Sequence, residues 1–123
     1  MIKNLLLVGL GGSIGSMVRY LVQKWLLPVS RNSGFPIGTL LVNIVGCLLI
    51  GILFGLSVKN SYSESKQVFL LAGLCGGFTT FSAFTLEGNE LLNEDRFGFF
   101  LLYIAGSVII GLSATWLGFK ITR

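Results

Sequence analysis

Long apolar segments alternate with short polar ones along the whole chain. Each apolar segment approaches or exceeds the ~20 residues that a helix needs to cross the hydrocarbon core of a bilayer. The apolar segments are residues 4–27, 37–58, 68–86 and 97–119, and the polar separators are residues 28–36, 59–67 and 87–96. This pattern predicts an all-α membrane protein in which residues 1–123 form a single transmembrane domain of four helices.

The third apolar segment is interrupted by small and polar residues. Gly76 and Gly77 are followed closely by Thr79, Thr80 and Ser82. Glycine weakens helix continuity, and hydroxyl groups need hydrogen-bond partners where water is absent. Interrupted helices occur at membrane depth where the freed backbone faces protein or lines a solute pathway. We therefore expect the third helix to be broken near its centre, at a membrane conduit or a tight subunit contact.

The placement of charge bears on orientation. Charged residues make up 11% of the chain, whereas a soluble domain carries about 25%. With four spans, one side of the membrane receives Lys3, Lys59, Lys66, Lys120 and Arg123, and the other receives Lys24, Arg31 and Arg96, plus Arg19 if its side chain snorkels that way. An excess of Lys and Arg normally fixes orientation. This weak bias is compatible with one ordinary topology, and also with insertion both ways followed by antiparallel pairing.

Few residues are of the types that carry enzyme chemistry. The chain has no histidine, and Cys47 and Cys75 lie singly inside apolar segments, so we expect packing thiols and no zinc site. The glycines of residues 9–15 imitate a dinucleotide-binding turn, but that fingerprint needs an acid about 20 positions further on. The first acid is Glu64. Because no base–nucleophile pair is evident either, we expect no enzyme.

Small residues recur four positions apart, the close-approach pattern of membrane helices. The pairs are Gly11 and Gly15, Gly51 and Gly55, and Gly73 and Gly77. In the fourth segment Ser107, Gly111 and Thr115 form one small, partly polar stripe. The stripe serves either helix packing or a polar track.

Three polar side chains stand within or at the end of apolar segments. Asn43 must be hydrogen-bonded in hydrocarbon, either to another helix or as a donor to a permeating anion. Arg19 either snorkels or faces water, where it would attract anions into a vestibule. Glu87 closes the third segment, at a helix end or in a wet pocket.

Three motifs, in order and at matching span positions, resemble the CrcB/Fluc family of fluoride channels. They are Gly11-Gly-Ser-Ile-Gly-Ser-Met-Val-Arg-Tyr20, Gly38-Thr-Leu-Leu-Val-Asn43 with Gly46, and Gly76-Gly-Phe-Thr-Thr-Phe-Ser-Ala-Phe84. The resemblance implies a dual-topology homodimer with two antiparallel fluoride pores. It also implies a structural sodium ion (Na+) at the dimer interface, held by backbone carbonyls at the break in the third helix.

Residue by residue, the resemblance assigns the sodium-binding carbonyls to Gly76 and Thr79. The fluoride pore residues carried over from the family are Asn43, Phe81, Phe84, Ser107 and Thr115, with Arg19 in the vestibule near the entrance. Two positions depart from the family pattern. Gly111 stands where a hydroxyl is expected, and Ala83 replaces the usual threonine.

The resemblance implies a passive, fluoride-selective channel in the cell inner (plasma) membrane that exports fluoride and relieves its toxicity. Its expected partners are fluoride, sodium, membrane lipid and an antiparallel second copy, without nucleic acid. A small multidrug-type, proton-coupled transporter is the first alternative, but it needs a carboxylate in the first span, and residues 1–27 contain none. A structural membrane subunit is the second alternative.

Overall fold

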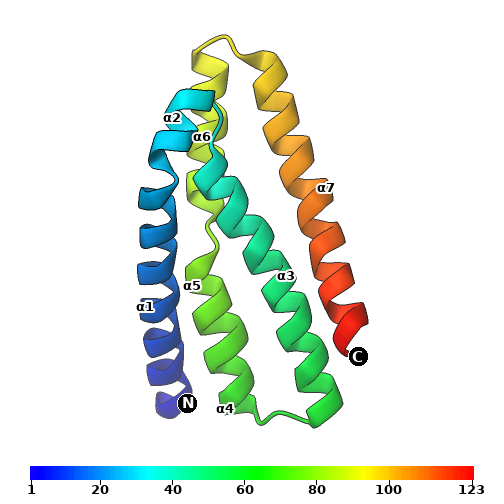
Figure 1. Cartoon of the computed structure of the whole chain (residues 1–123). Coiled ribbons are helices and arrows are strands. Elements are labelled where there is room, and N and C mark those ends of the chain that lie inside the picture. The colour runs from blue at the N-terminus through cyan, green and yellow to red at the C-terminus, as the bar shows by residue number, and fades with distance from the viewer.

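The computed structural model describes residues 1–123 and is entirely helical (Figure 1). Four stretches are long and apolar enough to cross a membrane. They are α1 (Ile2–Trp25), α3 (Ile37–Asn60), the composite span Glu64–Asn93, and α7 (Phe97–Thr122). The prediction of four membrane-spanning helices is confirmed, and the chain is a multi-pass membrane protein.

The first polar separator contains a short helix, which the sequence pattern did not predict. Helix α2 spans Leu27–Ser33 and has Pro28 in its first turn, where proline's missing N–H costs no hydrogen bond. Gly34 ends the helix with φ of 67°, a left-handed conformation that glycine adopts without steric cost. The connection between α1 and α3 is therefore a folded turn.

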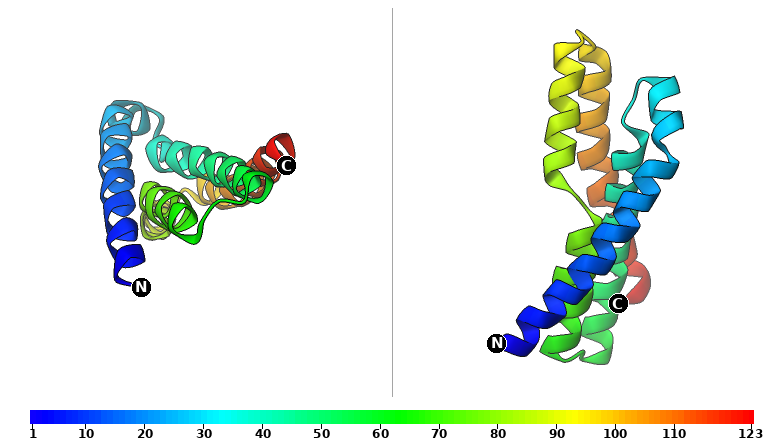
Figure 2. Two further views of the ribbon diagram at one scale, coloured as in Figure 1. Left: turned by 90° about the horizontal axis from the view of Figure 1, so that it is seen from below. Right: turned by 90° about the vertical axis from the view of Figure 1, so that its left-hand side faces the viewer.

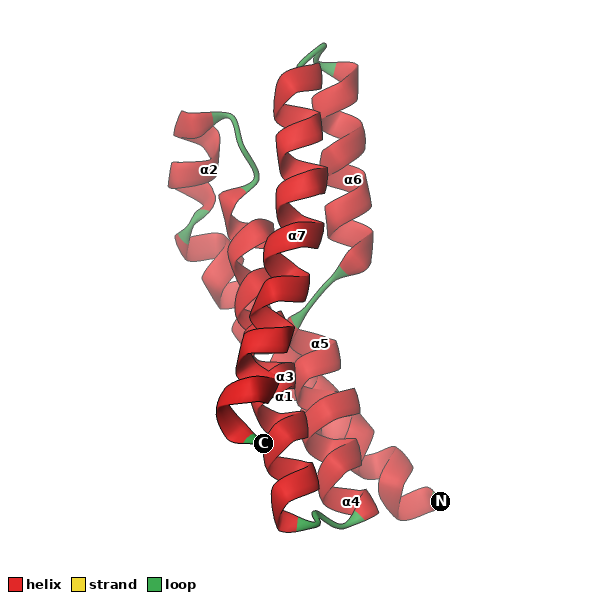
Figure 3. Cartoon of the chain, turned by 90° about the vertical axis from the view of Figure 1, so that its right-hand side faces the viewer, coloured by secondary structure: helices red, strands yellow, loops and turns green.

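The third span consists of four helical pieces in series. They are α4 (Glu64–Gln67), the π-helical stretch η1 (Val68–Cys75), α5 (Gly76–Phe78) and α6 (Phe81–Asn93). Thr79 and Thr80 are extended, with ψ of 159° and 118°, and form the loop between α5 and α6 (Figure 3). The predicted break near the centre of the third helix is confirmed. Gly76 itself is helical, so the interruption follows the glycine pair.

The glycines serve helix packing. α3 packs against α7, and α1 packs against η1 and α5. Figure 2 shows α1 running obliquely across the lower half of the bundle. A Cβ atom built on Gly77 would lie 2.5 Å from the carbonyl oxygen of Gly12, and one built on Gly51 would lie 3.0 Å from the backbone nitrogen of Phe119. Side chains at these positions would force the helices apart.

Most of the surface is apolar. Only 17 of the 123 residues are buried, and Trp25, Phe54 and Trp116 are among the large apolar side chains that are exposed. The largest fully buried side chains are those of Tyr103 and Val42. Such a surface suits contact with lipid or with another protein chain rather than with water.

Candidate functional site

The amide of Asn43 on α3 pairs with the interrupted backbone of the third span. Its Nδ2 donates to the carbonyl oxygen of Thr80 at 3.1 Å, and its Oδ1 accepts from the Thr80 N–H at 2.8 Å. The side chain thereby supplies both partners that a continuous helix would have given to Thr80. Of the two roles left open for Asn43, the structure shows the hydrogen bond to another helix, and both the nitrogen and the oxygen of the amide take part.

The break also changes the partners of nearby carbonyl groups. In a continuous helix the Gly76 carbonyl would accept from the Thr80 N–H, but that N–H donates to Asn43. The next carbonyl, that of Gly77, accepts from Nε of Arg19 at 3.1 Å. The side chain of Arg19 therefore reaches from α1 to the break, and it lines neither of the two pockets described below.

A third carbonyl, that of Thr79, loses its helical partner as well, because the Ala83 N–H donates to the N-capping hydroxyl of Thr80. The carbonyl oxygens of Gly76 and Thr79 are thus released from the helix ladder. Uncharged oxygen donors suit hard cations such as sodium. The donor set at the break fits the implied ion.

A cavity of about 360 Å³ lies beside the break. It brings together six of the predicted site residues: Asn43, Gly76, Thr79, Phe81, Phe84 and Ser107. Thr115 and Arg19 do not line it. The cavity therefore joins side chains from α3, both sides of the break and α7 in one place.

The two phenylalanines lie at the start of α6. The ring centroids of Phe81 and Phe84 are 5.8 Å apart, and Phe84 lies 5.1 Å from the ring of the buried Tyr103. Phe81 is 76% exposed on the single chain. One ring is therefore packed between helices, whereas the other extends from the surface.

The small stripe on α7 divides into two parts. The hydroxyl oxygen of Ser107 is buried and has no hydrogen-bond partner. The hydroxyl of Thr115 donates to the carbonyl oxygen of Cys47 at 2.9 Å, which ties α7 to α3. A Cβ atom on Gly111 would lie 3.3 Å from Sγ of Cys47. The thiol thus occupies the space beside the position at which the family pattern has a hydroxyl.

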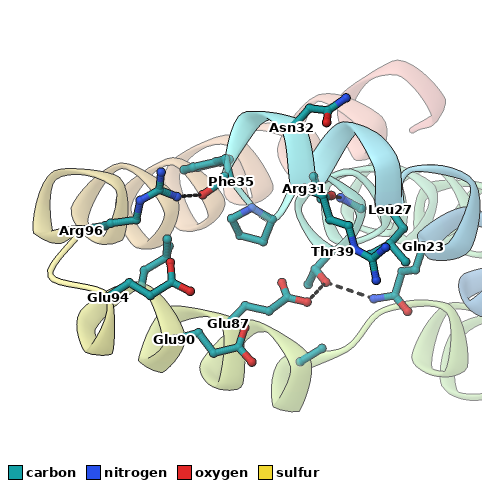
Figure 4. A pocket seen from close by; sticks show the side chains of 16 residues that line it. Gln23, Leu27, Arg31, Asn32, Phe35, Thr39, Glu87, Glu90, Glu94 and Arg96 are labelled. Atoms are coloured by element: carbon teal, nitrogen blue, oxygen red, sulfur yellow. Dashed lines mark hydrogen bonds between the residues drawn. The ribbon is translucent and has the colours of Figure 1, made fainter.

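A second, polar pocket of about 970 Å³ lies at the end of the bundle formed by α2 and α6 (Figure 4). Glu87 lines this pocket, and it does not stand at a helix end, because α6 continues beyond it to Asn93. Oε1 of Glu87 accepts from the Thr39 hydroxyl at 2.7 Å, and the Thr39 oxygen in turn accepts from Nε2 of Gln23 at 3.1 Å. Of the two predicted settings for Glu87, the structure shows a polar pocket.

Sequence reasoning did not identify all members of this network. The Tyr103 hydroxyl donates to Oε2 of Glu87 at 3.2 Å, so the network joins α1, α3, α6 and α7 through Gln23, Thr39, Glu87 and Tyr103. Thr39 belongs to the second motif, and that was the only sequence signal for it. Tyr103 stands alone among apolar residues and Gln23 stands beside Lys24 at the end of the first apolar segment. Only the fold brings the two near Glu87.

Comparison with known proteins gives consistent matches over nearly the whole chain. Residues 6–119 match the family model described as CrcB-like protein, Camphor Resistance (CrcB). A protein of Azobacteroides pseudotrichonymphae is 43% identical over 124 residues, covering 100% of this chain and 98% of the relative. One from Methylobacillus flagellatus is 46% identical over 98% of this chain and 94% of the relative, and one from Thermus thermophilus is 41% identical over the same shares. Each of these three relatives is named a fluoride-specific ion channel, FluC.

Proposed function

Because the chain belongs to the CrcB family, we propose that it is a passive channel selective for fluoride. The observation that carries the proposal is the cavity beside the break, where Asn43, Phe81, Phe84 and Ser107 meet. The relatives named as fluoride channels match this chain over almost its full length. The transporter alternative lacks support, since α1 carries no carboxylate.

The chemistry of fluoride explains the choice of donors. The ion is small and strongly hydrated, so a pore must replace water's donors without one tightly binding charge. The amide nitrogen of Asn43 carries two hydrogens, and the one that does not reach Thr80 is free for an anion. The unpartnered hydroxyl of Ser107 can donate as well. Each is neutral, so the ion can leave as readily as it enters.

The phenylalanines add weaker contacts. An aromatic ring carries partial positive charge at its edge, and Phe81 and Phe84 both line the cavity. Ring edges stabilise an anion less than an N–H group does. Such a sequence of modest contacts is what selective conduction requires.

The direction of transport follows from acid–base chemistry. Neutral hydrogen fluoride crosses membranes and ionises in a more alkaline cytoplasm, where fluoride is trapped. A membrane potential of 100 mV, negative inside, favours exit of a monovalent anion by about 2.3 kcal/mol. A passive pore therefore exports fluoride without a coupled ion.

We also propose that two copies associate antiparallel. Phe81 is 76% exposed on one chain, next to the break, and a second copy would cover it. A two-fold axis would bring the same surface of each copy into contact. The pair would contain two cavities in opposite orientations, one from each chain.

The released carbonyl oxygens support a bound sodium ion in this pair. Gly76 and Thr79 of each copy would supply the ligands, so two chains together would provide four oxygens. The positive charge would offset the cost of leaving these peptide dipoles without hydrogen bonds in a low-dielectric environment.

Fluoride efflux from liposomes containing the purified protein tests the function. A fluoride electrode should record release that depends on the protein, and a chloride electrode should record none. Phe81→Ile and Phe84→Ile should each lower the fluoride flux by at least about tenfold, because the substitution removes the electropositive ring edge while keeping an apolar side chain of similar size.

A check of assembly must accompany these variants. Phe54→Ile is the matched control, since Phe54 is exposed on α3 and does not line the cavity. It should conduct like the parent. Well-assembled Phe81→Ile and Phe84→Ile proteins with parental flux would show that the rings only fill space, and absence of any fluoride flux from the parent would reject the channel itself.

A further inference from the structure

The two ends of the helix bundle differ in charge. The N-terminus, the turn between α3 and α4, and the C-terminus lie toward one end (Figure 2). This end carries five exposed basic side chains and a single acid, Glu64, and we call it the basic end. The five are Lys3, Lys59, Lys66, Lys120 and Arg123. The opposite end carries three exposed basic and three exposed acidic side chains, and the half-buried Glu87 in the polar pocket is a fourth acid there. The exposed six are Lys24, Arg31, Arg96, Glu90, Glu94 and Asp95.

Aromatic rings accompany the cations of the basic end. Nζ of Lys120 lies 4.7 Å from the ring centroid of Trp116, and Nζ of Lys66 lies 3.6 Å from that of Tyr62. Trp116 is 61% exposed, one turn before Lys120 on the apolar helix α7. Tryptophan gathers at the level of lipid headgroups, and lysine next to it extends toward water. In a bilayer, we expect these cations to lie at the depth of the lipid phosphates.

At the opposite end, acidic side chains lie near the cations, and Arg96 has a hydrogen-bond partner within the protein. Arg96 donates to the carbonyl oxygen of Gly34 at 2.6 Å, which ties the α6–α7 turn to the end of α2. Arg31 and Arg96 line the polar pocket together with Glu90 and Glu94 (Figure 4). The two ends thus differ in how far their positive charge is balanced by protein groups.

From this asymmetry we propose that the basic end is a docking surface for the headgroups of anionic phospholipids. Clusters of four to eight Lys and Arg residues beside a membrane-spanning helix attract anionic lipid, and the basic end has five such residues. The ligand of this surface is a lipid, because the five cations lie at the ends of helices that face lipid. The phosphates of phospholipids supply the complementary negative charge there. The proposal does not depend on ion conduction. If copies pair antiparallel, each leaflet receives one basic end.

The positions of the two tryptophans provide an end-specific test. Trp25 is 75% exposed near the opposite end, and Trp116 is near the basic end. The variant Trp25→Phe leaves Trp116 as the only tryptophan, and Trp116→Phe leaves Trp25, so selective excitation of tryptophan reports on one end at a time. Each full-length variant is reconstituted in phosphatidylcholine with a minor fraction of acyl-brominated lipid, which quenches on contact. The brominated lipid is either phosphatidylglycerol or phosphatidylcholine.

Trp116 should be quenched about twice as strongly by the anionic brominated lipid as by the zwitterionic one, whereas Trp25 should show a ratio near one. The combined substitution Lys66→Gln, Lys120→Gln and Arg123→Gln should abolish the preference at Trp116. High salt should weaken it in the unsubstituted chain. Because the fluorophore marks an end of the protein, the result is the same for either orientation in the membrane.

Three outcomes would overturn the proposal. They are equal quenching of Trp116 by both lipids, an equal anionic preference at Trp25, and persistence of the preference after the three charges are removed. Addition of glycerol phosphate at constant ionic strength separates lipid from free phosphate. If glycerol phosphate removes the preference of Trp116 for anionic lipid, the basic end is a site for soluble anions instead of a lipid surface.

Discussion

At the scale of single residues, Asn43 determines how the break is accommodated in the membrane. Its amide accepts from the Thr80 N–H and donates to the Thr80 carbonyl. In hydrocarbon, each unpaired peptide group costs several kcal/mol. One side chain therefore removes two such costs, and it retains one N–H in the cavity where an anion would pass.

Replacing Asn43 with leucine, which has nearly the same shape, should remove both hydrogen bonds. We expect the free energy of unfolding to fall by about 3 kcal/mol, because two Thr80 groups lose their partners. Thermal unfolding in detergent measures the loss, and the efflux assay should show a parallel drop in fluoride flux. Asn60→Leu is the control, since Asn60 is exposed and bonds only within its own helix. Parental unfolding of Asn43→Leu would contradict the role given to the amide.

At the scale of helices, α1 acts as a support for the first half of the broken span. Gly11 and Gly15 are buried against η1 and α5, and Arg19 bonds the Gly77 carbonyl. A Cβ atom on Gly15 would lie 2.8 Å from the backbone nitrogen of Phe78. Backbone atoms cannot move aside as a flexible side chain can, so this contact requires glycine.

Gly15→Ala should therefore destabilise the protein by about 1–3 kcal/mol through overpacking. Gly9→Ala in the same helix should instead stabilise it by about 1 kcal/mol, because alanine favours the helix and no atom lies within 4 Å of the new Cβ. Opposite shifts in the unfolding midpoint are the expected result. Equal shifts for the two variants would argue against close contact between α1 and the third span.

The sequence predicted correctly those elements that depend on the local pattern of apolar and polar residues. The four apolar segments became the four spans, and the polar stretch in the third became the break. The sequence predicted the exact position of the helix break less accurately. The small and polar residues suggested a break over Gly76–Thr79, but Gly76 and Gly77 are helical, and the extended residues are Thr79 and Thr80.

Contacts between distant residues could not be read from such patterns. The bond from Arg19 to Gly77 spans 58 positions, and that from Thr115 to Cys47 spans 68. Local periodicity carries no information on these pairs. The same limit applies to Gly111, whose lack of a side chain makes sense only beside the Cys47 thiol.

At the scale of the whole molecule, the single chain leaves extensive apolar surface and the edge of its cavity uncovered. Lipid can cover the outer helix faces. The break carries hydroxyl groups and free carbonyls, for which lipid offers no partners. The proposed second copy in the opposite orientation would satisfy both needs, and the weak charge bias of the sequence is compatible with it.

Cysteine labelling tests this arrangement. On a background of Cys47→Ala and Cys75→Ala, a cysteine in place of Asn60 should be labelled from both sides of the membrane, each side reaching part of the population. Asn32→Cys, exposed on α2 near the other end, should give the same two-sided result. Labelling of position 60 from one side only, with position 32 labelled only from the other, would indicate a single topology and reject the antiparallel pair.

The pairing of the break with earlier parts of the chain has a consequence for biosynthesis. Arg19 and Asn43, which bond the groups of Gly77 and Thr80, both precede the break in the sequence. The ribosome therefore delivers their helices to the membrane before residues 77–80 emerge. The polar peptide groups of the third span can find their partners as soon as that span leaves the translocation machinery, without waiting for α7 or for a second copy.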